Sequence, residues 1–171
     1  MSTGNPLRRT QRFSFHAPTG ATIRTPNTQP KRTTNSKQSG SRPTIDQYHS
    51  TSAAQAHVNY TISQPTWLPT GFTLQYAHVL TVDNASTTSQ VYANSTGTRI
   101  IVMQLPISAT RHLTRPTSGA NTSVNGYTAT YASLGGGSMI HWTCGGFEHT
   151  IQAHLRRQPT LRIANATACT G

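Results

Sequence analysis

The chain has 171 residues, a hydrophobic content of 33% and a formal net charge of +11, with only three acidic residues. The length suits one domain, and the hydrophobic share is below that of most globular chains, so part of the chain is expected not to fold. Three carboxylates cannot supply a convincing acid pair for catalysis, and no apolar run is long enough for a membrane helix or a secretory signal. We therefore expect a protein that is not an enzyme.

Residues 1–50 are predicted to form a disordered basic tail. They are rich in Thr, Ser, Asn, Gln and Pro, a composition that cannot bury enough apolar surface to fold. Such a tail is either a solvated linker or a segment that binds nucleic acid, another polyanion or an anionic membrane surface. Its basic residues are Arg8, Arg9, Arg12, Arg24, Lys31, Arg32, Lys37 and Arg42.

Residues 51–171 are predicted to form a single α+β domain that starts with a short helix. Thr51–Val58 favours this helix because it is rich in Ala and begins with Ser and Thr residues that can cap it. Pro65–Phe72 follows as an extended lead-in, since its two prolines exclude a helix and Gly71 allows a turn. Trp67 and Leu68 are expected to anchor this lead-in on the fold.

About six strands are predicted from alternating apolar residues bounded by Gly, Asn and Ser turns. Short turns pair consecutive strands antiparallel, so the strands should form a meander sheet. In the first strand Phe72, Leu74, Tyr76, His78 and Leu80 are expected to share one face. A polar loop should separate the third strand from the fourth, and a terminal helix is expected to pack on the sheet. The predicted elements are the strands Phe72–Val82, Thr88–Ala93, Thr98–Leu105, Ser123–Ala132, Ser138–Cys144 and Phe147–Leu155, and the helix Gln158–Ala168.

A series of short segments, in this order and spacing, resembles one protein family. The segments are Ala53–Ile62, Pro65–Phe72, Val91–Gly97, Ile100–Val102, Val124–Tyr127, His141–Thr143, Gly146–Phe147 and Leu161–Ala164. They resemble the bacterial domain of unknown function found at the extracytoplasmic end of membrane-anchored proteins that are anti-sigma-factor-like or associated with sporulation. Thr70 departs from the acidic residue usual in this family, which removes one surface charge.

The resemblance implies a non-enzymatic sensing or protein-interaction domain that regulates an anti-sigma-type signalling system. Its partner would be another protein or a component of the cell envelope, and its location would be extracytoplasmic. The membrane helix and the cytoplasmic segment usual in the family are absent from this sequence. A cytoplasmic location, or a fragment of a longer anchored chain, therefore stays open.

Cys144 and Cys169 are the only cysteines. If the terminal helix packs back over the sheet, they can form a disulfide that contributes roughly 3 kcal/mol. A disulfide would indicate an oxidising compartment. The alternative is a pair of free thiols.

Three histidines, His141, His149 and His154, fall on the last two predicted strands. His141 and His149 could lie opposite each other and bind zinc or copper. The preferred interpretation is that they are ordinary strand histidines, so no metal and no cofactor is expected.

Aromatic residues along the domain form either its core or an apolar groove on a curved sheet. The core is the preferred interpretation, because a small domain needs most of its aromatic area to offset the entropy of ordering. A groove would instead indicate a carrier or chaperone for an apolar ligand or a lipoprotein. The residues concerned are Trp67, Phe72, Tyr76, Tyr127 and Trp142.

Overall fold

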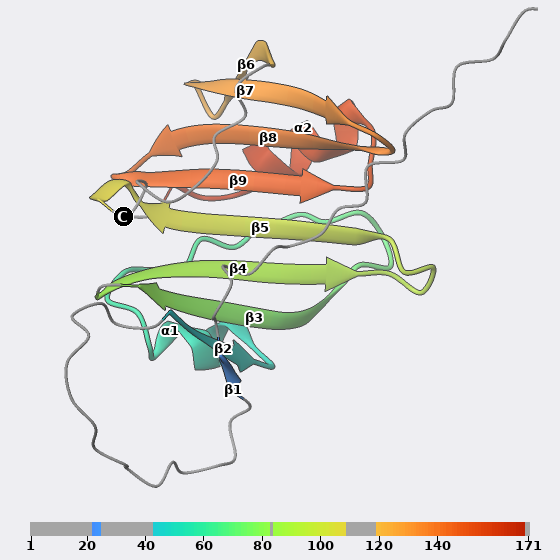
Figure 1. Ribbon diagram of the computed structural model, residues 1–171. Coiled ribbons are helices and arrows are strands. Elements are labelled where there is room, and N and C mark those ends of the chain that lie inside the picture. The colour runs from blue at the N-terminus through green and yellow to red at the C-terminus, as the bar shows by residue number, and fades with distance from the viewer. Residues whose placement is uncertain (1–21, 25–42, 83, 109–118, 170–171) are drawn as a thin grey trace, which may run out of the picture.

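The computed structural model describes residues 22–24, 43–82, 84–108 and 119–169, and these form one sheet with helices on one face (Figure 1). The strand order is β1-β2-β3-β4-β5-β9-β8-β7-β6. Strands β2 to β9 pair antiparallel, and the short β1 adds to the edge of β2 in parallel. The α+β class is thus confirmed. The strands are β1 (Thr22–Arg24), β2 (Thr44–Tyr48), β3 (Thr73–Val82), β4 (Ala85–Ala93), β5 (Arg99–Pro106), β6 (Ala120–Val124), β7 (Tyr127–Leu134), β8 (Gly137–Cys144) and β9 (Phe147–Ala153).

The prediction of about six strands was too low. The predicted strand Ser123–Ala132 is two strands, because Asn125 and Gly126 both have positive φ (50° and 84°) and turn the chain back between β6 and β7. Two residues with positive φ are the signature of a tight hairpin turn. Strand β2 was missed because it is short and lies in the polar region that reads as disordered.

The boundary predicted at residue 51 also lies inside the sheet, because β2 precedes it and pairs with β3 along its whole length. Residues 1–21 and 25–42 lie outside the described part of the chain, so the disordered tail stays a prediction. The same holds for residues 109–118 of the predicted polar loop.

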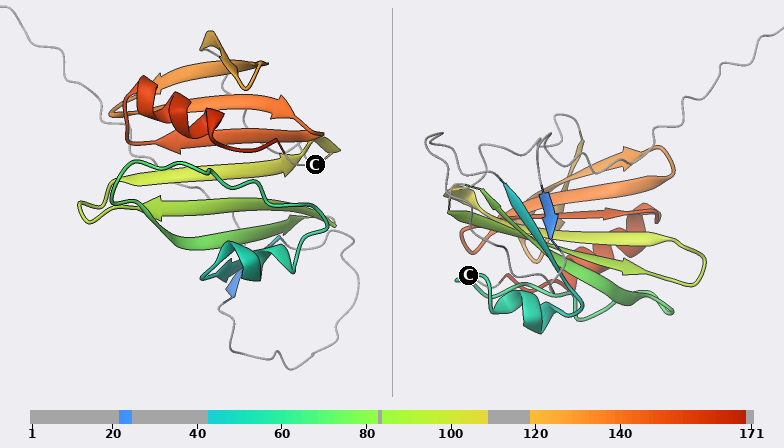
Figure 2. Two further views of the ribbon diagram at one scale, coloured as in Figure 1. Left: turned by 180° about the vertical axis from the view of Figure 1, so that it is seen from behind. Right: turned by 60° about the horizontal axis from the view of Figure 1, so that its bottom comes forward.

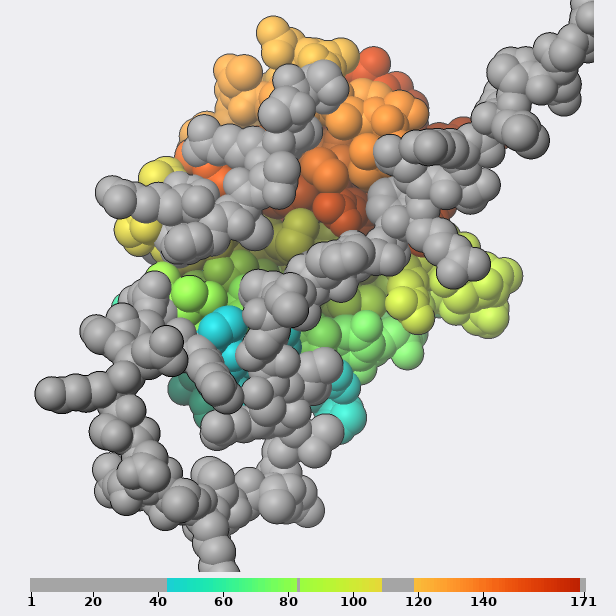
Figure 3. Space-filling model, in the orientation of Figure 1, coloured from blue at the N-terminus to red at the C-terminus, as the bar shows by residue number. Residues whose placement is uncertain are grey.

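The sheet is two hairpin series joined side by side rather than one simple meander. β2 to β5 follow one another across the sheet, and β9 to β6 continue it in reverse order. The join is the antiparallel pair β5–β9, in which Ile100 faces Ala153 and Val102 faces Ile151. The turn between β4 and β5 projects beyond the neighbouring strands (Figures 1 and 3).

A β-bulge in β3 overturns the predicted apolar face of that strand. Leu74 pairs with Tyr92, but Tyr76 pairs with Val91, so the register shifts by one residue between them. A bulge of one residue reverses which side chains point to each face. Leu74 therefore shares its face with Ala77 and Val79, whereas Tyr76, His78 and Leu80 lie on the other face.

One face of the sheet carries both helices, as the view from behind shows (Figure 2). Helix α1 (Thr51–Gln55) begins at Ser50, whose side chain accepts a hydrogen bond from the Ala53 amide at 3.1 Å. Helix α2 (Arg157–Asn165) contacts β8, β9 and β6, which confirms the predicted helix across the sheet. Between β3 and α1 the segment 56–72 crosses the same face.

Two apolar clusters fill the space between these layers. The smaller lies under α1 and contains Ala54, Ile62, Ala77 and Val79. The larger lies under α2, where Ile163 and Ala164 meet the sheet at 0% exposure. Its sheet residues include Tyr92, Ile100, Val102, Ile140, Trp142 and Ile151. None of the described helices is long and apolar enough to cross a membrane.

Candidate functional site at the disulfide end of the sheet

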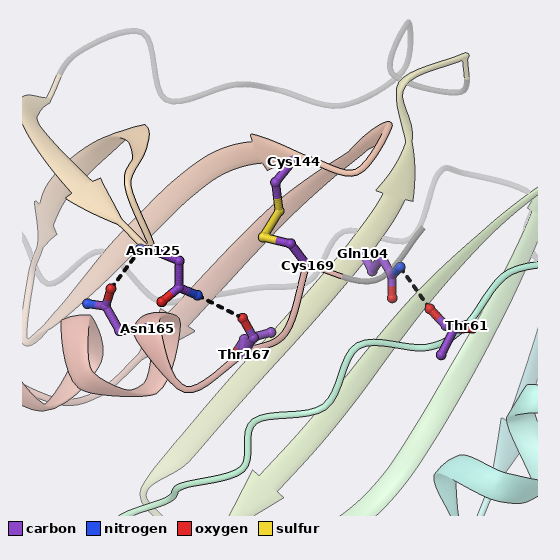
Figure 4. The surroundings of a disulfide bond; sticks show 7 residues. All are labelled: Thr61, Gln104, Asn125, Cys144, Asn165, Thr167 and Cys169. Atoms are coloured by element: carbon purple, nitrogen blue, oxygen red, sulfur yellow. Dashed lines mark hydrogen bonds between the residues drawn. A yellow bond between two sulfur atoms is a disulfide. The ribbon is translucent and has the colours of Figure 1, made fainter.

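A disulfide bond joins Cys144 at the end of β8 to Cys169 beyond α2 (Figure 4). Their Cα atoms are 5.7 Å apart, within the usual range for a disulfide. Cys144 is a buried member of the larger core cluster, and the partly buried Cys169 packs against that cluster. The sequence prediction that the two cysteines can pair agrees with this position.

The β6–β7 turn holds the chain between α2 and the disulfide. The Asn125 amide donates to the side-chain oxygen of Asn165 at 2.8 Å, and the Asn125 side chain donates to the Thr167 carbonyl at 3.2 Å (Figure 4). The Thr167 hydroxyl donates back to the Ile163 carbonyl at 2.9 Å. The end of α2 is thus fixed by backbone and side-chain groups as well as by the disulfide.

The lead-in Pro65–Phe72 docks on the same end of α2. Pro65 forms an isolated β-bridge with Thr167, and the Thr66 amide and hydroxyl both donate to the Ala166 carbonyl, at 2.8 and 3.0 Å. Trp67 and Leu68 are partly buried and pack against the larger core cluster, as the predicted anchors should. The Arg162 guanidinium lies 4.0 Å from the centre of the Trp67 ring, a cation–π contact.

Glutamine side chains replace strand pairing for the segment that leads to Pro65. Gln104 accepts from the Ser63 amide at 2.7 Å and donates to the Thr61 carbonyl at 3.0 Å (Figure 4). Gln90 donates to the Ser63 carbonyl at 2.8 Å. Gln90 and Gln104 are each 1% exposed. Sequence reasoning missed them, although each occupies an inward position of an alternating strand, where a polar residue needs a partner.

His149 and Trp142 form a buried pair of stacked rings beside the disulfide. Their ring centres are 5.1 Å apart, and the rings are 15° from parallel. Neither ring nitrogen of His149, nor the indole nitrogen of Trp142, has a hydrogen-bond partner within the described residues. The pKa of His149 is lowered to about 4, mainly by burial and to a smaller extent by nearby His141, while the Cys144 backbone acts in the opposite direction. His149 is therefore neutral near pH 7.

Residues 62–166 match the family described as a domain of unknown function, DUF4367. The match covers more than half of the chain and includes the lead-in, all strands from β3 to β9 and α2. The chain belongs to the DUF4367 family. The matched range contains Cys144 but ends before Cys169. A search of curated proteins found no significant match.

In this DUF4367 domain the two histidines considered as metal ligands do not face each other. His141 pairs with Thr150, whereas His149 pairs with Trp142. Because side chains alternate along a strand, His141 and His149 lie on opposite faces of the sheet. The hairpin turn at Gly145 and Gly146 sets this register, which is one residue away from the alignment that would place His141 opposite His149. His141 instead exchanges a hydrogen bond with the Thr150 hydroxyl at 3.1 Å.

The five aromatic residues singled out by the sequence do not share one surface of the DUF4367 domain. Trp142 is 1% exposed in the core, and Trp67 and Phe72 pack against that core from its edge. Tyr76 lies on the opposite face, where its ring centre is 4.7 Å from that of His78. Tyr127 follows the β6–β7 turn and is 44% exposed.

Proposed function

We propose that this DUF4367 domain is a non-enzymatic sensing or protein-interaction module that acts outside the cytoplasm, within an anti-sigma-type signalling system. The observation that carries the proposal is the disulfide between Cys144 and Cys169. Disulfides persist in oxidising compartments and are rare where the cell keeps thiols reduced. The partner would be another protein or a component of the cell envelope.

The exposed side of α2 supports contact with a protein. Arg157 stacks on Tyr131 with 4.9 Å between the guanidinium carbon and the ring centre, and Arg162 stacks on Trp67. Both arginines are exposed. Arginine and aromatic side chains are enriched at protein interfaces and at the residues that dominate binding energy. Because each guanidinium group is stacked on a ring, these arginine and aromatic side chains are held in fixed positions.

The compartment is tested by trapping thiols in cells that produce the chain from its natural gene. Cells are quenched in acid, and the denatured protein is alkylated with a high-mass maleimide before and after reduction. We expect no mass shift before reduction and two additions after it. Two additions without reduction would contradict the extracytoplasmic assignment, and a Cys144→Ala/Cys169→Ala variant is the control for reagent specificity.

The contact surface is tested by placing a photo-crosslinking amino acid at Gln158, which is exposed on α2. We expect a discrete crosslinked partner in the natural host, and its loss when Arg157→Glu and Arg162→Glu are combined. Arg99→Glu makes one charge reversal of the same kind, half the total of the double variant, at an exposed position on the β4–β5 side of the sheet, so it should leave the crosslink unchanged. An equal loss in both variants would contradict binding through α2.

The other two functions stay predictions. Polyanion binding was assigned to the basic tail, whose arginines and lysines fall outside the described side chains. The carrier of an apolar ligand was assigned to a groove formed by the aromatic residues discussed above. Deleting residues 1–42 and testing retention of a hydrophobic dye separate these two functions from the one proposed.

A further inference from the structure

An open groove of about 610 Å³ lies where three turns of the sheet come together. Its walls come from the segment after α1, the start of β4, the chain just after β5 and the start of β9. The described residues whose chemistry matters here are Asn59, Tyr60, Asn84, Ser86, Ser108 and Phe147. This volume is typical of sites for small molecules.

Two aromatic rings in the groove are held in fixed positions before any ligand arrives. The ring centres of Tyr60 and Phe147 are 4.8 Å apart with a tilt of 49°. The Tyr60 hydroxyl donates to the Ser86 carbonyl at 3.2 Å and lies 3.4 Å from the Thr88 hydroxyl. Phe147 pairs across the β8–β9 turn with Cys144, whose disulfide ties this turn to the chain beyond α2.

The polar side chains among the described residues that line the groove are neutral, and each can donate or accept hydrogen bonds. Asn59 and Asn84 provide side-chain amides, and Ser86 and Ser108 provide hydroxyls. No carboxylate, amine, guanidinium or imidazole occurs among the described residues that line the groove. A charged ligand would find no opposite charge on these residues, and a purely apolar ligand would make no use of their amides and hydroxyls.

We propose that this groove binds a neutral sugar ring or a short neutral glycan. The apolar C–H face of a sugar packs against an aromatic ring, and its hydroxyls exchange hydrogen bonds with amides and hydroxyls around that ring. Tyr60 and Phe147 supply the ring surface, and Asn59, Asn84 and Ser108 supply the polar contacts. The inference deepens the proposed function, on which it rests, because it makes the envelope component a glycan.

The test is calorimetric titration of the purified, oxidised full chain with two neutral oligosaccharides, chitotetraose and maltotetraose. We expect saturable binding of at least one of them. Phe147→Leu keeps an apolar side chain and removes the ring, and it should weaken binding by about tenfold or more. Asn59→Ala changes an exposed residue and should also weaken binding. Tyr127→Ala removes an exposed aromatic residue outside the groove and should leave binding unchanged.

Absence of saturable binding to either oligosaccharide at millimolar concentration would overturn the inference. Binding that survives both Phe147→Leu and Asn59→Ala, in variants whose circular dichroism matches the parent, would overturn it as well. Thiol trapping and crosslinking at Gln158 do not involve the groove. A trapped disulfide and a crosslinked partner without sugar binding would therefore remove this inference alone. Sugar binding by a chain with free thiols in the cell would remove the proposed function alone.

Discussion

His149 places a titratable imidazole in the buried core, and neither ring nitrogen has a hydrogen-bond partner among the residues that the structure describes. Its imidazole is 0% exposed and stacks on Trp142. A buried imidazole without partners stays neutral, because the protonated form would lose its hydration. The fold thus tolerates His149 near pH 7 and opposes its protonation.

Lowering the pH should therefore destabilise the folded domain through His149. The unfolded chain binds this proton near pH 6.5, whereas the folded chain binds it only at about pH 4. Between these values the unfolded state holds more protons, so the free energy of unfolding falls as the pH falls, by on the order of 3 kcal/mol. Urea unfolding at intervals from pH 7.5 to 4.5 measures this slope.

The variant His149→Phe keeps an aromatic ring on Trp142 and should flatten the slope below pH 6.5. Half-buried His78, whose pKa burial also lowers, contributes a smaller slope in the same direction. The exposed His49 is the control, and His49→Gln should retain the pH dependence of the parent. An unchanged slope in His149→Phe would assign the acid sensitivity elsewhere.

Trp67 should contribute to stability although it lies at the edge of the core. Trp67→Ala removes a partly buried ring and its stacking with Arg162. We expect a loss of about 2 to 3 kcal/mol, at or below the lower end of the range for fully buried aromatic residues. The measurement is denaturant unfolding, with the exposed Tyr127→Ala as a control expected within about 0.5 kcal/mol of the parent. An unchanged midpoint for Trp67→Ala would leave the ring available as a binding residue.

At the scale of elements, the segment between α1 and β3 is held mainly by side chains of its neighbours. Gln55 donates to the Tyr60 carbonyl at 2.6 Å and accepts from the Ile62 amide at 2.8 Å. Gln104 accepts from the amide of Ser63, the next residue of the segment. Buried backbone groups need such partners, since leaving one unpaired costs about 1 to 3 kcal/mol. Gln55, Gln90 and Gln104 thus do for this segment what a neighbouring strand does elsewhere in the sheet.

Gln104→Leu should therefore detach the segment while it leaves β5 in place. We expect the free energy of unfolding to fall by about 2 to 3 kcal/mol, because the Ser63 amide loses a hydrogen-bond partner in a residue that is only 1% exposed. Hydrogen exchange at Ser63 should quicken more than exchange in the centre of β5. Gln64→Leu is the matched control, since Gln64 lies on the exposed side of the same segment. Equal effects of both variants would contradict a specific role of Gln104.

Sequence patterns predicted elements well where the local signal was complete. Ala-rich residues after Ser50 predicted α1, and alternating apolar residues predicted β5, β8 and β9. The patterns failed where one residue decided the outcome. The bulge between Leu74 and Tyr76 reverses which side chains of β3 point to each face of the sheet. A register difference of one residue places His141 and His149 on opposite faces. Assigning side chains to faces by their alternation assumes that the strand is unbroken and that its register with the neighbouring strand is known. Neither the bulge nor the register of β8 and β9 could therefore be predicted from the sequence pattern.

At the scale of the whole molecule, the C-terminal end of the domain is tied to three distant parts of the chain. The disulfide joins Cys169 to the end of β8. Asn125, in the turn between β6 and β7, donates to the Thr167 carbonyl, and Thr66, in the lead-in before β3, donates to the Ala166 carbonyl. Sequence reasoning identified the cysteines and the lead-in separately. It could not show that both meet at α2, because that meeting depends on the order of the strands across the sheet.

Removing the disulfide should lower the stability of the whole domain. Cys144 and Cys169 are separated by 25 positions, and a loop of this length corresponds to about 3.5 kcal/mol in the chain-entropy estimate. Cys144→Ala/Cys169→Ala should therefore show a lower melting temperature than the oxidised parent, with a circular dichroism spectrum that keeps its strand content. The reduced parent should resemble the variant. Equal melting temperatures of oxidised and reduced protein would contradict this role.

The pairing of β5 with β9 also constrains the order in which the chain can fold. Among the described strand pairs it joins residues farthest apart in the sequence, as with Ile100 and Ala153. Pairs between neighbouring strands lose less chain entropy on closing and form faster than distant ones. Cys144 ends β8 and Cys169 follows α2, so both cysteines lie after β5 in the chain and their thiols can meet before β5 docks. Oxidation can then precede completion of the sheet.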